Sequence, residues 1–400
     1  MNVINVKLPI LIFSYFYCLF MSLVNMQLAV VILFVFVSFV LTKGILSSAE
    51  KFFVFFFVLI NFIFNSYNFD PISGVDEQAF ISNIRNTNII ELFLGEIKSL
   101  FDTLGFISSR ITFSAFLSVV FLNKDFVTDE YVIFLINTFL WFVGSHVYLS
   151  SIKNKRLVDN IKIGYLFLFL SPTILYWTGN FGKDVVVVSF CMLSAAFFLQ
   201  KKFALFFLFA IIALLFRPYS LVMIACFVVP LVYGFRVMSA LFILITLVFL
   251  YGTKFAIEPL INTVLAFIYV FLSPNPVSIN NWTLVASSNG FSFSPLIMLV
   301  EALIISFLIF YAVLFKKYDK YKVLKTFIAI YCLSICLVGV GYTNISSNDE
   351  ALAIGSLGDN FVRKKIIVWP LLALLLNFFY GNKHTDESSS YNKIPKPRWS

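Results

Sequence analysis

The sequence has few charges, few histidines and none of the short motifs that mark nucleotide or metal enzymes. Only 12% of its 400 residues are charged. It contains no Walker A motif, no GxGxxG and no HExxH. The two histidines, His146 and His384, are far apart, and the five cysteines all lie in apolar runs, so we expect no metal site and no cofactor. No basic stripe with interleaved stacking aromatics is present outside the apolar runs, so we expect no nucleic-acid partner.

What remains is apolar: 60% of the residues are hydrophobic, 52 of them Phe, and the mean hydropathy is +0.95. This composition excludes a soluble globular domain. A spanning helix needs about 20 residues, so we predict an all-α polytopic integral membrane protein, with residues 1–380 forming one domain of about 11–13 transmembrane helices. The apolar runs lie at about 8–24, 28–42, 52–68, 104–122, 131–150, 163–178, 185–199, 203–216, 219–234, 237–251, 295–315, 323–343 and 366–380. No small-residue cleavage site follows the first run, which we interpret as a spanning helix and not a cleaved signal.

Three polar stretches are long enough to be loops: 70–103, 252–294 and 344–365. Apolar residues recur at helical spacing in the first, which predicts an amphipathic helix on the membrane surface. The second is rich in Asn, Ser and Pro, with an apolar stretch at 264–272 that we expect to enter the interface. The tail, 381–400, is polar and is predicted to be a disordered cytoplasmic segment.

Basic clusters predict the orientation of the chain. They lie at 153–162, at 201–202, at 316–325 and in the tail. Placing all of them in the cytoplasm puts residues 179–184, Arg217 and the loops 252–294 and 344–365 on the external face. Counting the spans from the N-terminus places loop 70–103 on the external face, whereas counting back from the C-terminus places it in the cytoplasm. This disagreement indicates that one segment between 52 and 150 does not span. Segment 104–122, which contains Arg110, is our candidate.

The first candidate site is Lys183-Asp184, which follows Gly179 and Gly182 and precedes the apolar run 185–199. In structural terms, Asp184 would be the N-cap of that helix and the glycines would permit a tight turn. In functional terms, a helix N-terminus with a lysine beside it binds anions, and a lipid-linked diphosphate would suit it.

Two arginines could add phosphate contacts. Arg217-Pro218 ends the run 203–216, and Arg363 precedes the last run. Arg217 could bind phosphate oxygens bidentately. Alternatively, it reaches the headgroups while Pro218 opens the next helix at its first position. Arg363 is either a second phosphate contact or an interfacial anchor. Because 185–199 and 203–216 form a hairpin, we expect Arg217 to lie close to Lys183.

Asp76 and Glu77 are paired carboxylates in the first loop. A carboxylate can take the proton of an acceptor hydroxyl in a sugar transfer, and Asp184 could do the same. Alternatively, the pair is solvated loop charge.

In these features the chain resembles the bacterial oligosaccharide repeat-unit polymerases, the O-antigen polymerase family of the inner membrane. The resemblance rests on sparse motifs between about 70 and 380: Asp76, Ser171-Pro172, Trp177, Gly182-Lys183-Asp184, Arg217-Pro218, Ser273-Pro274-Asn275-Pro276, Asn360 and Arg363. It implies polymerisation of polyprenyl diphosphate-linked oligosaccharides into O-antigen, capsule or exopolysaccharide at the external face of the bacterial inner membrane. No nucleotide sugar or metal is required.

The resemblance implies roles for these residues. Lys183, Arg217 and Arg363 would stabilise the leaving diphosphate, and Asp76, Glu77 or Asp184 would be the base. The implied partners are the polyprenyl diphosphate-linked oligosaccharide, membrane lipids, a chain-length regulator and a flippase. Three alternatives stay open: another lipid-sugar glycosyltransferase or an O-antigen ligase, a lipid-linked oligosaccharide flippase, and a scaffold membrane protein.

Overall fold

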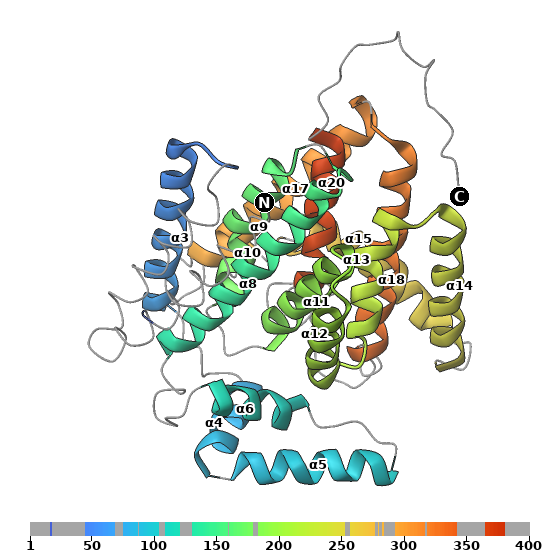
Figure 1. Ribbon diagram of the computed structural model, residues 1–400. Coiled ribbons are helices and arrows are strands. Elements are labelled where there is room, and N and C mark those ends of the chain that lie inside the picture. The colour runs from blue at the N-terminus through green and yellow to red at the C-terminus, as the bar shows by residue number, and fades with distance from the viewer. Residues whose placement is uncertain are drawn as a thin grey trace.

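The computed structural model describes residues 17, 45–68, 75–86, 88–103, 109–120, 130–158, 160–178, 183–252, 257–276, 279, 282–283, 293–316, 318–341 and 365–380. Over these ranges the chain forms 15 α-helices, one 3-10 helix and no strand (Figure 1). The all-α class is therefore confirmed for the part of the chain that the structure describes. Run 28–42, run 8–24 apart from Tyr17, loop 344–365 apart from Lys365, and the tail 381–400 lie outside it.

The elements, in chain order, are α3 (Ser48–Asn68), α4 (Val75–Asn86), α5 (Ile89–Thr103), α6 (Ser109–Val120), α8 (Glu130–Asn154), α9 (Lys162–Leu170), α10 (Pro172–Thr178), α11 (Lys183–Leu199), α12 (Phe203–Phe216), α13 (Ser220–Val232), α14 (Phe235–Gly252), α15 (Ile257–Leu272), α17 (Phe293–Phe315), α18 (Lys320–Gly341), the 3-10 helix η1 (Lys365–Val368) and α20 (Trp369–Tyr380).

Two described stretches, Phe235–Gly252 and Leu296–Phe315, are each long and apolar enough to cross a bilayer. The pair α10 and α11 would make a third span if it is one helix bent by 113°. Shorter apolar helices accompany them, at Phe203–Phe216, Ser220–Val232, Ile261–Leu272 and Lys365–Tyr380. These stretches indicate a membrane protein, and the number of 11–13 spans stays a prediction.

The apolar run 163–178 is divided into two helices at Ser171. This residue has an extended backbone (ψ 114°), while its N–H still donates to Phe167 O at the end of α9. The cause is Pro172, because a residue before proline is disfavoured in the helical region. Pro172 then opens α10 at its first position, where its missing N–H costs nothing.

The predicted loop 252–294 contains a helix. We expected only residues 264–272 to enter the interface, but α15 starts at Ile257 and packs against α18 and α17. The helix forms because its apolar residues have two neighbouring helices to cover them, and a sequence window does not reveal those neighbours.

The centre of the bundle is α11, which packs against α8, α12, α13 and η1. All of its residues except Phe198 are buried. Its contact with α8 is close at Gly144, where a Cβ atom would come 3.0 Å from Ser189 O. α20 is buried in the same way against α9, where the Gly164 N–H donates to Asn377 Oδ1 at 2.8 Å. These two buried helices form the rigid core of the bundle.

A separate layer of α4, α5 and α6 lies at one end of the bundle, seen at the bottom of Figure 1. It meets the bundle through aromatic side chains, because the rings of Phe113 and Phe116 pack on Phe216 at the end of α12. The twelve residues of α6 extend about 18 Å, whereas a bilayer core is about 30 Å thick. This helix alone is therefore too short to cross, and the side of the membrane on which the layer lies stays a prediction.

Candidate functional site

Three predicted site residues meet where the α11–α12 hairpin opens. Lys183 and Asp184 are the first two residues of α11 and are only 7% and 5% exposed. Arg217 follows the last residue of α12, and its Nη2 donates to Asp184 Oδ1 at 2.8 Å. The predicted approach of the two helix ends is thus seen as a partly buried ion pair, with the Arg217 side chain 15% exposed. Such a pair is costly to desolvate and is kept only where its geometry and partners are good.

The turn after α12 sets the position of Arg217. Its backbone is extended (φ −148°, ψ 122°), and its carbonyl accepts from the Ser220 N–H at 3.0 Å and from the Ser220 hydroxyl at 2.7 Å. The same hydroxyl lies 2.8 Å from Ala213 O, so Ser220 ties the last turn of α12 to the first residue of α13. This turn points the guanidinium toward α11.

Two local predictions at this site are wrong. Asp184 is not the N-cap of α11, because the helix already includes Lys183 and the Asp184 carboxylate accepts from Arg217 instead. Pro218 does not open α13, because it lies in the turn and the helix begins at Ser220. The Asp184 carboxylate takes part in a tertiary contact with Arg217, whereas Pro218 lies in a local turn in which the Ser220 N–H donates to Arg217 O at 3.0 Å.

The helical layer covers the charged cluster. The Lys183 ammonium lies 5.6 Å from the ring centroid of Phe80 on α4, at a distance typical of a cation–π contact. The Phe80 ring packs edge-on against Phe113, and its carbonyl accepts from the Ser114 hydroxyl at 3.3 Å. Arg217 lies at a similar distance, 5.9 Å, from the ring of Tyr219. Aromatic rings thus flank both cations.

The other predicted site residues are placed only in part. Asp76 and Glu77, expected in a loop, lie in the first turn of α4, where the structure describes the backbone alone. They precede Phe80 by one helical turn, so their helix is the one that contacts Lys183. Arg363 lies outside the described residues, two positions before Lys365.

A second polar cluster, which the sequence reasoning missed, lies inside the bundle. Glu301 on α17 is 8% exposed, and its carboxylate accepts from Thr173 N at 3.0 Å and from the Thr173 hydroxyl at 2.5 Å. Lys365, at the start of η1, is 1% exposed and attracts Glu301 electrostatically. Charged side chains among apolar helices are expensive and mark functional positions by default.

This interior cluster joins the chain at Ser171-Pro172 to the chain at Ser273-Pro274. The Lys365 ammonium donates to Ser273 O and lies 4.6 Å from the ring centroid of Trp369. The Trp369 indole N–H in turn donates to Ser171 Oγ at 2.8 Å. Side chains from η1 and α20 therefore hold the ends of α9 and α15, which are far apart in sequence.

Two signals could have revealed the interior cluster. Glu301 is the only charged residue in the 23-residue apolar helix α17, and an isolated carboxylate in such a run needs a partner. Lys365 is less conspicuous, because it is the last residue of the basic run 363–365 and resembles an ordinary interfacial lysine.

The comparisons with known proteins add no family. A scan against protein-family models finds no match to this chain, and searches of the curated proteins and of the solved structures find none either. The function is therefore argued from the two charged clusters and the helices that carry them.

Proposed function

We propose that this chain polymerises oligosaccharide repeat units that are linked to polyprenyl diphosphate, at the external face of the bacterial inner membrane. The observation that carries the proposal is the meeting of Lys183, Asp184 and Arg217 at one end of the bundle. Two cations at the start of a buried helix suit a diphosphate, since that helix end also attracts negative charge.

In the proposed reaction, a sugar hydroxyl of one lipid-linked unit attacks the anomeric carbon of the growing glycan. The bond from that carbon to the diphosphate oxygen breaks, and the electron pair leaves with the polyprenyl diphosphate. Lys183 and Arg217 stabilise the charge that develops on this leaving group, and Arg363 is a third candidate. The hydroxyl proton passes to a carboxylate.

The ion pair divides the candidate carboxylates by role. Asp184 Oδ1 already accepts from Arg217, so Asp184 is better suited to orient the guanidinium than to take a proton. Asp76 and Glu77 are then the candidate bases, because their helix carries Phe80, which contacts Lys183.

A chain-length regulator and a flippase are the proposed protein partners. A ligase or another lipid-sugar glycosyltransferase would use the same groups on a different acceptor.

One observation favours a second function. The cluster of Glu301 and Lys365 lies within apolar helices, and buried ionisable pairs of this kind mark transport pathways as well as enzyme sites. A flippase for the same lipid-linked oligosaccharide is therefore the alternative function.

The test is the length of surface glycan in a deletion strain complemented with wild type or with Arg217→Ala, separated as a ladder on a gel. We expect wild type to restore the ladder, and the variant to leave single repeat units at the surface. If single units also disappear from the surface and lipid-linked units accumulate inside, the flippase is favoured. An unchanged ladder in the deletion strain would reject both functions.

A further inference from the structure

Two neighbouring helices, α8 and α11, end in basic residues. α8 ends at Asn154 and α11 at Leu199, and the Gln200 side-chain amide donates to Ser151 Oγ at 2.7 Å, which ties the two helix ends together. The basic helix ends, as we call them, consist of five cations: Lys153, Lys155 and Arg156 at the end of α8, and Lys201 and Lys202 between α11 and α12.

Both helix ends have the same left-handed turn. Arg156 (φ 54°) and Lys201 (φ 61°) are the two residues other than glycine with positive φ in the described part of the chain. Their N–H groups donate to Lys153 O and Phe198 O, and the N–H of the next residue donates to the carbonyl five positions back, at 3.1 and 2.9 Å. This is the Schellman motif, in which glycine is the usual residue at the left-handed position. Cations replace glycine at both ends, which favours a role for their charge.

The five cations have no counter-charge among the residues that the structure describes. Four of the side chains are exposed and that of Lys202 is half-buried, and none of them forms an ion pair there. Other nearby cations are balanced, because Lys162 pairs with Glu50 and Lys322 lies 3.8 Å from Asp319. The basic helix ends are therefore a surface that attracts anions.

An exposed apolar face begins directly after Lys202. It lies on α12, which starts at Phe203 and buries only three of its side chains. The large exposed side chains of this helix are Phe203, Leu205, Phe207, Leu208, Ile211 and Leu214. α12 extends about 21 Å from the lysines. The surface is thus cationic at one end and apolar along its length, as a phospholipid is charged at its headgroup and apolar along its acyl chains.

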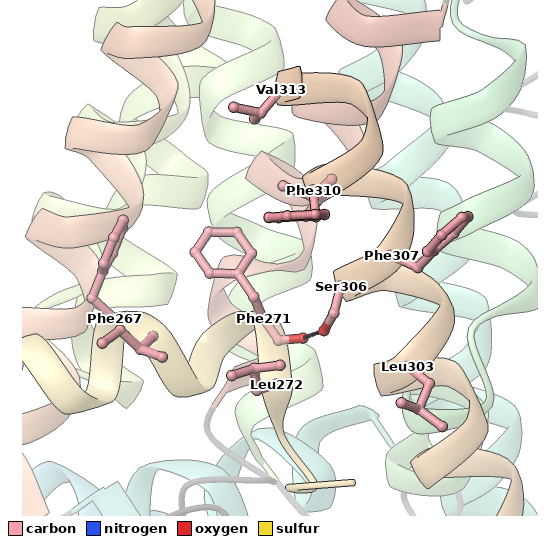
Figure 2. A pocket seen from close by; sticks show the side chains of 10 residues that line it. Phe267, Phe271, Leu272, Leu303, Ser306, Phe307, Phe310 and Val313 are labelled. Atoms are coloured by element: carbon pink, nitrogen blue, oxygen red, sulfur yellow. Dashed lines mark hydrogen bonds between the residues drawn. The ribbon is translucent and has the colours of Figure 1, made fainter. Parts of the chain in front are cut away.

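A second apolar surface of the bundle lacks such charge. A groove of about 570 Å³ lies between α15 and α17 (Figure 2). The one polar side chain among its described lining residues is Ser306, whose hydroxyl lies 2.7 Å from Phe271 O within the wall. No charge in this lining distinguishes one headgroup from another, so the groove is an internal reference for contact with bulk lipid.

We propose that the basic helix ends bind the headgroup of an anionic phospholipid whose acyl chains lie along α12. Five cations over two helix ends suit a lipid with two phosphates, and basic sites between membrane helices hold lipids of this class. A zwitterionic headgroup gains little there, because its own ammonium offsets its phosphate. The site lies at the opposite end of α12 from Arg217, and the proposal does not depend on the proposed reaction.

The test is photocrosslinking of full-length protein in phosphatidylethanolamine nanodiscs. One probe is cardiolipin, a lipid with two phosphates, that carries a diazirine on an acyl chain; the other is the matching diazirine phosphatidylethanolamine. We expect the cardiolipin probe to label α12 peptides at least fivefold more than the zwitterionic probe, whereas both probes label α15 and α17 equally. The same ratio of the two probes on α12 and on the groove would overturn the proposal, because both surfaces would then hold bulk lipid.

Glycine variants separate charge from structure. Arg156→Gly and Lys201→Gly each remove a cation and place the favoured residue in the left-handed turn, so thermal unfolding should show no loss of stability. Each should lower the cardiolipin excess on α12 about fivefold, the effect of one cation near an anionic membrane. Arg156→Lys and Lys201→Arg keep the charge and should keep the excess.

Lys98→Gln is the matched control, since Lys98 is an exposed cation on α5, in the layer that packs on the other end of α12. We expect it to leave the cardiolipin excess unchanged. An equal loss in this variant would overturn the proposal, because net charge would then attract the lipid. So would a wild-type excess in both glycine variants. Displacement of the cardiolipin probe by soluble pyrophosphate would also overturn it, since the site would then take a free anion.

Discussion

The two charged clusters contrast in position and in the part of the chain that builds them. The cluster of Lys183, Asp184 and Arg217 lies at the end of one hairpin, in contact with α4, and is built from residues at most 34 positions apart. The interior cluster joins Thr173 on α10, Glu301 on α17 and Lys365 on η1. The first is placed by local turns. The second depends on packing between distant segments, so we expect it to matter more for folding.

The largest expected effect is that of Arg217→Ala. Removing a preorganised cation that stabilises developing charge lowers a rate about 10²–10³-fold, so we expect the glycan ladder to be lost. Polymerisation of purified lipid-linked units in proteoliposomes would measure the rate, and unfolding in detergent would show whether stability is kept. A stable variant with a wild-type rate would mean that the end cluster is structural.

Glu301→Ala is expected to act on stability first. Removing the carboxylate leaves the buried Thr173 N–H and hydroxyl without their acceptor, at a cost of about 1–3 kcal/mol for each unsatisfied group, and takes away the charge that attracts Lys365. The free energy of unfolding in detergent is the measurement. The double variant Glu301→Leu with Lys365→Met is the control, and we expect it to be more stable than Glu301→Ala. If the single variant were as stable as wild type, the two clusters would not differ in the way described.

Gly164→Ala tests the frame of the interior cluster without changing a charge. A Cβ atom at Gly164 would collide with the Asn377 amide nitrogen and come 3.0 Å from Ala373 O. Overpacking of this kind costs about 1–3 kcal/mol, which thermal unfolding should detect. Gly234→Ala is the matched control, since a Cβ atom there meets nothing within 4 Å. Equal effects of the two changes would show that the contact of α9 with α20 is not tight.

The smallest effect is expected from Ser220→Ala, which disturbs the frame of the end cluster. The change removes a hydroxyl that lies within hydrogen-bond distance of two carbonyls near Arg217, at a cost of about 1 kcal/mol. We expect a shorter glycan ladder with a small loss of thermal stability. If stability fell but the ladder stayed unchanged, the turn would not position Arg217.

Much of the helix pattern could be predicted from the sequence, because apolar runs and prolines act locally. The helices α9 and α12 end directly before Ser171 and Arg217, each of which precedes a proline. Lys183 and Arg217 come together because a short connection joins α11 to α12. The N-cap role of Asp184 was wrong because α11 already includes Lys183, so Asp184 lies inside the helix.

What could not be predicted depends on contacts between distant segments. Nothing local to Phe80 indicates that its ring lies over Lys183, which is 103 positions away. Glu301 stood out only as a lone charge, and its partners Thr173 and Lys365 lie 128 and 64 positions away in the chain. The roles of Asp76, Glu77 and Arg363 stay predictions, since their side chains lie outside the described part of the structure.

The burial of α11 has a consequence for how this protein can evolve. An outer helix such as α14, where only three residues are buried, can exchange one apolar residue for another on its exposed face. α11 has almost no such face; its neighbours are side chains and backbone that do not yield. We therefore expect substitutions in descendants of this chain to occur mostly on the outer helices. The sequence from Lys183 to Leu199 should change slowly and keep Lys183 and Asp184.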